Sequence, residues 1–137
     1  MQIMLDTNIL LSASVFPNER MNRIIDFIVA NHTLVLSDVV IAEFLEVANY
    51  DKFKKLSAAQ ELLKNLNYTE YKTPNVVSLK DVSIRDEDDY AILFSAIESA
   101  VDIFITRDKD FLECGVLIPR MLTLNDFESE FMRGGLR

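Results

Sequence analysis

Four acidic residues stand at matching places along this chain. Asp6 and Asp108 each follow an apolar run that is typical of a buried strand, whereas Glu43 and Asp89 lie in the first turns of two expected helices. Parallel strands end at a common edge, where open α/β sheets bind ligands, so these four side chains could meet in one crevice. Such a cluster is costly without a cation, because like charges raise one another's pKa values.

The chemistry that suits four such carboxylates is the binding of a divalent metal. Mg²⁺ and Mn²⁺ are hard ions that prefer oxygen ligands. Ions held in this way can activate a water and stabilise the attacking and leaving oxygens of an in-line displacement at a phosphodiester. The pattern therefore predicts a cation, while the substrate stays open.

Each acid also has a simpler explanation as a helix cap or a solvated surface group. Asp commonly caps helices, and acids in a first turn are favoured by the helix dipole. The run 86–89 holds four consecutive acids, however, and a helix start benefits from only one or two of them. Capping explains any one acid well and the coincidence of all of them badly.

Strands and helices alternate along the chain, which predicts a three-layer α/β domain with a mainly parallel central sheet flanked by helices. The periodicity indicates one domain over residues 1–133 and a loose C-terminal tail at 134–137. Expected strands cover residues 2–5, 33–36, 101–106 and 121–123, with a further strand or extended segment at 75–79 after a loop at 68–74. Expected helices cover 19–31 and 39–50, another begins at 57, and a closing helix capped by Thr123 or Asn125 ends near 133.

The composition is typical of a globular protein. Half of the 137 residues are hydrophobic, and only three are Gly and three Pro, which fits one globular domain. No apolar run approaches the roughly 18 residues of a membrane helix, and no secretory signal is visible, so we expect a cytoplasmic protein without membrane contact. The single cysteine, Cys114, fits a reducing compartment and is expected to be a small buried hydrophobe.

The order and spacing of these fragments resemble the PIN-domain nucleases. The likeness covers nearly the whole chain. It is carried by Asp6-Thr7-Asn8, by Ser37 with Glu43 six residues later, by Asp89 before Ile92 and Ala96, and by Thr106-Arg107-Asp108-Lys109-Asp110-Phe111.

The resemblance implies an endoribonuclease that depends on Mg²⁺ or Mn²⁺ and hydrolyses RNA phosphodiesters with a metal-activated water. Its catalytic acids carry over to Asp6, Glu43, Asp89 and Asp108, all four also metal ligands. Asp110 matches a further metal-binding acid.

The identity of the third acid stays open, and three polar residues accompany the acids. Asp86 and Asp88 are rivals of Asp89 for the third acid. Asn8, Ser37 and Thr106 match the polar residues that orient ligands and waters.

The small single-domain form is similar to the VapC-type toxins of toxin–antitoxin pairs. That likeness implies a type II toxin that forms a homodimer and binds an antitoxin protein. One segment departs from the pattern. Asp108-Lys109-Asp110-Phe111 is one residue shorter than the Asn-x-x-Asp-Phe form common in those toxins, and is closer to the Asp-x-Asp-Leu form of a related branch.

The net charge of −8 argues against broad nucleic-acid binding, and two divalent ions would still leave about −4. RNA would therefore have to meet local basic patches. The candidates are Arg107, Lys52, Lys54 and Lys55, with Arg20 and Arg23 as weaker ones, and ordinary solvated surface is the competing interpretation of each.

Three other function classes compete with the nuclease. A catalytically inactive PIN-like module that binds RNA or protein is the main alternative, although all four acid positions are occupied here. A phosphatase that forms an aspartyl phosphate needs a second Asp two residues after the nucleophile, where this chain has Asn8. A receiver domain needs an adjacent acidic pair after the first strand, and none is present.

Overall fold

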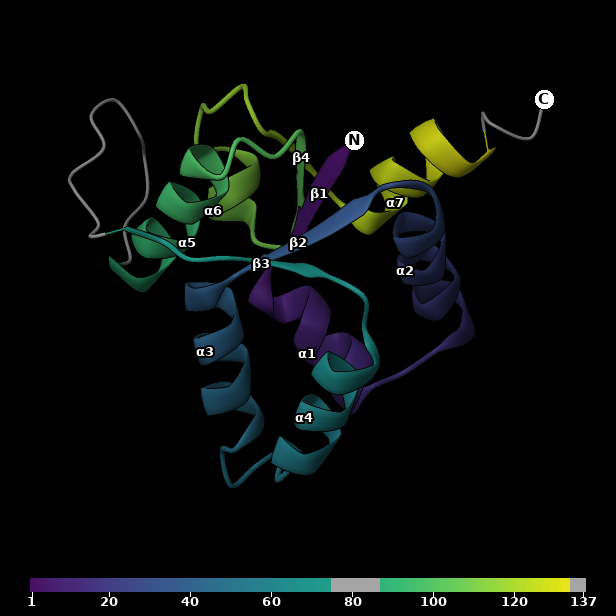
Figure 1. The fold of residues 1–137 in the computed structure, drawn as a ribbon, viewed down its shortest axis with the longest axis vertical. Helices are drawn as coiled ribbons and strands as arrows, with labels where there is room; N and C mark the ends of the chain where they lie inside the picture. The colour runs from purple at the N-terminus through teal and green to yellow at the C-terminus, as the bar shows by residue number, and fades with distance from the viewer. Residues whose placement is uncertain (75–86, 134–137) are drawn as a thin grey trace.

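The computed structural model describes residues 1–74 and 87–133, which form a five-stranded sheet with helices around it (Figure 1). The strands are β1 (Gln2–Leu5), β2 (Thr33–Ser37), β3 (Thr69–Tyr71), β4 (Ile103–Ile105) and β5 (Arg120–Leu122). The helices are α1 (Thr7–Val15), α2 (Glu19–Asn31), α3 (Asp38–Ala48), α4 (Leu56–Asn65), α5 (Glu87–Glu98), α6 (Lys109–Leu112) and α7 (Leu124–Phe127), followed by a π-helical segment η1 (Glu128–Arg133).

All strand pairs are parallel, in the order β3-β2-β1-β4-β5. The central strand β1 pairs with β2 on one side and with β4 on the other, so that Ile3 lies between Leu34 and Ile103. These residues are almost wholly buried. Strands covered on both faces carry continuous apolar runs, which explains why β1, β2 and β4 are the clearest strands in the sequence.

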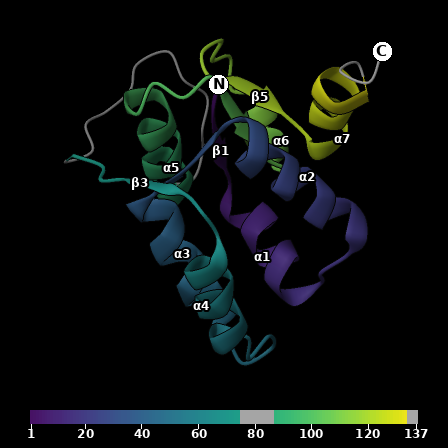
Figure 2. The ribbon, with the colours of Figure 1, turned by 45° about the vertical axis from the view of Figure 1, so that its right-hand side comes forward.

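Helices cover both faces of the sheet, as the three-layer prediction requires. Both α2 and α5 pack against β2, and the two views place them on opposite sides of the strands (Figures 1 and 2). Helices α1, α3 and α4 pack against one another, and α1 and α3 begin where β1 and β2 end. The predicted α/β architecture with a parallel sheet is confirmed.

Polar caps mark the carboxyl edge of this sheet. Asp6 caps α1, Ser37 caps α3, Asp108 caps α6 and Thr123 caps α7, and in each the side chain accepts a hydrogen bond from a backbone N–H of the helix. Ser37 is the last residue of β2, and the other three caps follow their strands by one to three residues. The strand ends therefore gather four oxygen-bearing side chains at one edge.

The structure differs from the sequence-based expectation at one loop and does not describe two other segments. The loop expected over 68–74 is wrong, because Thr69–Tyr71 forms the edge strand β3 beside β2. The segment 75–79, expected as a strand or extended, lies outside the described residues, as does the tail 134–137. The closing helix is present in two parts, α7 and η1, with Thr123 as its cap.

Two smaller expectations can be compared with the structure. Cys114 is 3% exposed, in agreement with its interpretation as a buried hydrophobe. Across residues 1–74 and 87–133, every helix is too short or too polar to cross a lipid bilayer.

Candidate active site

Asp6 is the most buried acid at the carboxyl edge of the sheet. Asp6 follows β1, the central strand, and is 3% exposed to solvent. Its Oδ1 accepts the N–H of Thr7 at 2.7 Å, and its Oδ2 accepts the hydroxyl of Thr106 at 2.6 Å. Its own N–H donates to the carbonyl of Ile105 at 2.9 Å, which continues the pairing of β1 with β4. The carboxylate is thus held in one orientation by the ends of two neighbouring strands.

Thr106 joins Asp6 to Asp108. The Thr106 side chain is fully buried; its hydroxyl donates to Asp6 and accepts the N–H of Asp108 at 2.9 Å. Asp108 then uses Oδ1 to accept the N–H of Asp110 at 2.9 Å, which caps α6. Two of the predicted acids are therefore linked through the Thr106 hydroxyl.

Burial raises the pKa of Asp6 from 3.8 to about 6. Hydrogen bonds from Thr106 and Thr7 act in the opposite direction, while the negative charges of Glu43 and Asp108 raise the pKa further. Repulsion of this kind requires proximity, so the structure brings Glu43 and Asp108 each near Asp6. Asp6 lies directly after β1, Glu43 lies on α3, and Asp108 lies in the segment after β4.

Glu43 and Asp89 lie on two helices that contact each other, α3 and α5. Both residues are half-buried. Glu43 also lines a hollow of about 300 Å³ between these helices, together with Glu46 and Tyr50. Of the two rivals for the third acid, Asp86 and the side chain of Asp88 lie outside the described residues.

The donor chemistry around Asp6 fits a hard divalent ion, because every candidate ligand is a carboxylate. Within the part of the chain that the structure describes, no three acidic, histidine or cysteine side chains gather closely enough to hold a metal. The three interacting acids therefore form a loose cluster of negative charge.

Asn8 and Ser37 have specific local contacts. Asn8 accepts the N–H of Arg107 at 3.4 Å through Oδ1, and its carbonyl accepts the Arg107 guanidinium at 3.2 Å. The Ser37 hydroxyl, fully buried, accepts the N–H of Val40 at 3.3 Å and so caps α3. Asn8 thus fastens the segment after β4 to α1, and Ser37 orients the helix that carries Glu43.

One contact at this edge was not foreseen in the sequence. Asp38 Oδ1 accepts both the N–H of Thr73 at 3.0 Å and its hydroxyl at 2.6 Å. Partial burial acts to raise the pKa of Asp38, but these bonds and one from the Val39 N–H outweigh it and hold the pKa below its ordinary value. The pair ties the chain after β3 to the start of α3. Its partners are 35 residues apart, and no local pattern could have joined them.

The predicted basic residues occupy two different regions. Lys52, Lys54 and Lys55 lie between α3 and α4, at the far end of an 11-residue helix and hence roughly 16 Å from the sheet edge. Arg107 is exposed directly after Thr106 and lines a second hollow with Arg20. Of the predicted basic residues, Arg20 and Arg107 line this hollow at the same edge as the acids.

Comparison with known proteins gives an independent view of the fold. A chain of the VapBC2 complex from Rickettsia felis, bound to a DNA fragment from its promoter, is similar with a TM-score of 0.63 and 16% identity, over 90% of this chain and 97% of that one. The RRP44 PIN domain of T. brucei is similar with a TM-score of 0.60 and 16% identity, over 98% of this chain and 82% of that one. A comparison with curated proteins found no match.

The amino-acid sequence also matches a known protein family. A PIN-domain family model matches residues 2–110, a range that contains the central strand, the Thr106 link and every predicted acid. The α/β fold of this chain, with its five-stranded parallel sheet flanked by helices, matches the fold of the two solved structures. This chain therefore belongs to the PIN-domain family.

Proposed function

We propose that this protein is an endoribonuclease that depends on Mg²⁺ or Mn²⁺ and hydrolyses phosphodiester bonds of RNA. The observation that carries the proposal is the state of Asp6, a buried carboxylate at the centre of the sheet edge with two acids close enough to raise its pKa. A protein gains nothing in stability from such an arrangement, because buried like charges destabilise the fold. A divalent cation would offset that cost. Membership of a family of nuclease-type fold supports the same interpretation.

In this proposal the acidic residues are the ligands of the metal. Asp6, Glu43, Asp89 and Asp108, with Asp110 beside them, would hold one or two ions. When bound, the metal would supply Lewis acidity and a water of lowered pKa.

Thr106 would keep the Asp6 carboxylate pointing in one direction through its 2.6 Å hydrogen bond. Because that hydroxyl also accepts the N–H of Asp108, it would set the spacing between two of the ligands. Asn8 and Ser37 would fix the elements that carry the others. No side-chain nucleophile is needed.

We further propose that the protein is the toxin of a type II toxin–antitoxin pair, acting in the cytoplasm as a homodimer with an antitoxin partner. The support is the likeness to a chain of the VapBC2 complex, whose full length is almost matched. The short Asp108–Phe111 segment would place it in a branch apart from the common VapC form.

A second candidate function is a catalytically inactive PIN-like module that binds RNA or protein. It is favoured by one observation, the absence of a close group of three metal-binding side chains among residues 1–74 and 87–133. A module of this kind would keep the sheet edge and lose the affinity for metal.

The decisive experiment combines cleavage with metal binding. The purified protein is incubated with a panel of single-stranded RNAs and Mn²⁺, beside an EDTA control, Asp6→Asn, and Asp26→Asn as a matched loss of an exposed acid on α2. We expect cleavage by wild type and Asp26→Asn, and none by Asp6→Asn or with EDTA. Cleavage that survives Asp6→Asn would refute the assigned roles. Absence of both cleavage and calorimetric Mn²⁺ binding would favour the inactive module.

A further inference from the structure

A hollow of about 460 Å³ opens between the start of α2 and the start of α7, beside the candidate active site. Its polar lining comes from Asn18, Arg20, Arg107, Thr123 and Asn125. Arg107 follows β4 and Thr123 follows β5, so the hollow lies at the same sheet edge as Asp6. Arg107 also bonds Asn8, two residues after Asp6. The hydrogen bonds between Arg107 and Asn8 thus connect the hollow to the segment that carries Asp6.

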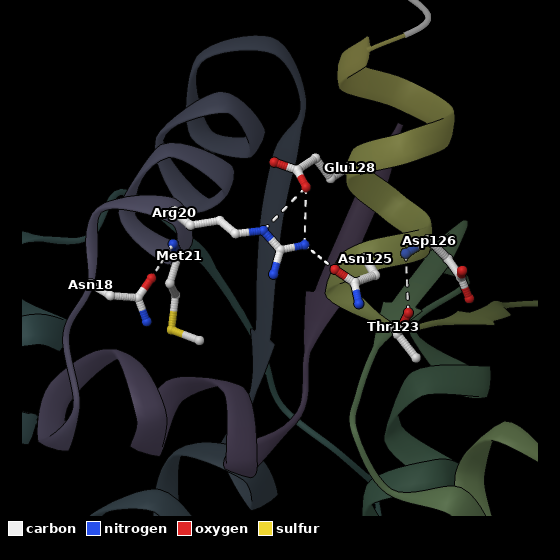
Figure 3. A network of polar contacts seen from close by, with 7 residues as sticks. All are labelled: Asn18, Arg20, Met21, Thr123, Asn125, Asp126 and Glu128. Atoms are coloured by element: carbon white, nitrogen blue, oxygen red, sulfur yellow. Dashed lines mark hydrogen bonds and ion pairs between the residues drawn. The ribbon is translucent and has the colours of Figure 1, made fainter.

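The acceptor atoms of this lining are already used inside the protein (Figure 3). Asn18 Oδ1 accepts the N–H of Met21 at 2.9 Å, and Thr123 Oγ1 accepts the N–H of Asp126 at 3.0 Å. Asn125 Oδ1 accepts Arg20 Nη2. Because a backbone N–H and a guanidinium can only donate, they fix which amide atom is the oxygen. Both amides therefore have their NH₂ groups left to donate.

Arg20 is held in place by a buried acid. Its Nε and Nη2 donate to Glu128 at 3.1 and 3.0 Å, and Glu128 is 8% exposed. Within the described part of the chain, Arg20 Nη1 makes no hydrogen bond. Figure 3 draws this nitrogen and the amide nitrogens of Asn18 and Asn125 on the same side of the network. The hollow thus presents several donors that are already oriented.

The net charge of the hollow is positive. Glu128 offsets the charge of Arg20. Among residues 1–74 and 87–133, Arg107 has hydrogen bonds only to the neutral Asn8 and no ion pair, so its charge is uncompensated. The apolar part of the lining is Met21, Ile24 and Leu124. A positive, donor-rich hollow with an apolar side suits a ligand that combines acceptor oxygens with a flat apolar ring.

We propose that this hollow binds one nucleotide of the RNA strand next to the cleaved bond, with its phosphate at Arg107 and its base acceptors facing Asn18, Arg20 and Asn125. The inference rests on the proposed ribonuclease function and adds a subsite to it. Its volume falls within the range of about 300–1,000 Å³ that is usual for small-ligand sites, which fits a single nucleotide better than a protein surface.

Two substitutions test the donors without disturbing the fold. Asn18→Asp keeps the oxygen that caps α2, and an acid at that position is favoured by the helix dipole. Asn125→Asp keeps the oxygen that accepts Arg20. Each replaces an NH₂ donor by a carboxylate. Asn22→Asp adds the same charge one turn further along α2, outside the lining of the hollow, and serves as the matched control.

Affinity is measured by fluorescence anisotropy with a labelled 12-nucleotide single-stranded RNA. All variants carry Asp6→Asn and are kept in EDTA, and a gel confirms that the RNA stays intact. We expect Asn18→Asp and Asn125→Asp to weaken binding roughly tenfold or more, because each variant loses a donor and sets a carboxylate against an acceptor of the base. Asn22→Asp should change it less than threefold. Thermal melting should show all three to be folded.

The outcomes separate this subsite from the nuclease itself. Equal weakening by all three variants would indicate a general charge effect and overturn the subsite. Unchanged RNA binding, with hexaglutamate binding to wild type but not to the two variants, would overturn it in favour of an acidic protein partner. For cleavage, Asn18→Asp and Asn125→Asp are made in protein that keeps Asp6 and are assayed with Mn²⁺. Cleavage by both variants at the wild-type rate would also refute the subsite while the nuclease stands. Weakened RNA binding in a protein that does not cleave would support the subsite and refute the nuclease.

Discussion

The substitution Asp6→Asn is expected to stabilise the metal-free protein at neutral pH. The folded-state pKa of Asp6 is about 6, against an ordinary value of 3.8. Because the folded pKa is the higher one, the favourable contribution of this group is complete below pH 3.8 and is lost as the pH rises through 6. A difference of about two in pKa corresponds to roughly 3 kcal/mol. At pH 7.5 the ionised carboxylate therefore costs up to about 3 kcal/mol, which a neutral Asn would not.

The measurement is urea unfolding in EDTA at several pH values from 4.5 to 8, for wild type, Asp6→Asn and the exposed control Asp26→Asn. Other carboxylates also titrate at the acid end, so the informative quantity is the difference in the free energy of unfolding between wild type and each variant. For Asp6→Asn this difference should grow with pH up to about 7 and then become constant. For Asp26→Asn it should stay flat. Parallel profiles for wild type and Asp6→Asn would show that the pKa of Asp6 is not raised in the folded protein, and would refute the inference that its carboxylate needs a cation.

Further predictions concern the groups around this carboxylate and the metal. Thr106→Val removes one hydrogen bond to Asp6 and one from Asp108, so the free energy of unfolding should fall by about 2–4 kcal/mol in urea melts at pH 7.5. Ser37→Ala removes the cap of α3 and should cost about 1 kcal/mol in the same assay. Asp38→Asn should flatten the acid limb of the stability profile, because the lowered pKa of Asp38 gives stability that is lost as the pH falls below about 4. Mn²⁺ at a hundred times its Kd should stabilise wild type by about 2.7 kcal/mol in calorimetry and leave Asp6→Asn unchanged.

The elements that could be predicted from the sequence are those with a strong local signal. Helix α2 has the bounds expected from its periodicity, because Asn18 caps it and Pro17 precedes the cap. The strands β1 and β4 are short apolar runs covered on both faces. Strand β3 has no such signal, because Thr69–Tyr71 is three residues long, lies at the sheet edge, is largely exposed and lacks an apolar run.

The sequence predicts which residues belong to the candidate site, but it does not predict their geometry. The motif residues identify Asp6 and Thr106, but the hydrogen bond that joins them spans 100 residues of sequence. The same holds for Asp38 with Thr73, and for Arg20 with Glu128, 108 residues apart. Contacts of this kind depend on the order of the strands and on how helices pack over them. The hollow beside α7 depends on them too, so it could only be found in the folded chain.

In the sequence, helix capping and metal binding are competing interpretations of the acids. In the structure, the two are compatible. Asp6 and Asp108 do cap helices, each through Oδ1. Yet hydrogen bonds from a helix start lower the pKa of a carboxylate, and the pKa of Asp6 is raised. Burial together with the charges of Glu43 and Asp108 must therefore outweigh the cap. Capping explains the position of Asp6 at the start of α1. It does not explain the unfavourable environment of its ionised carboxylate, which a bound cation would stabilise.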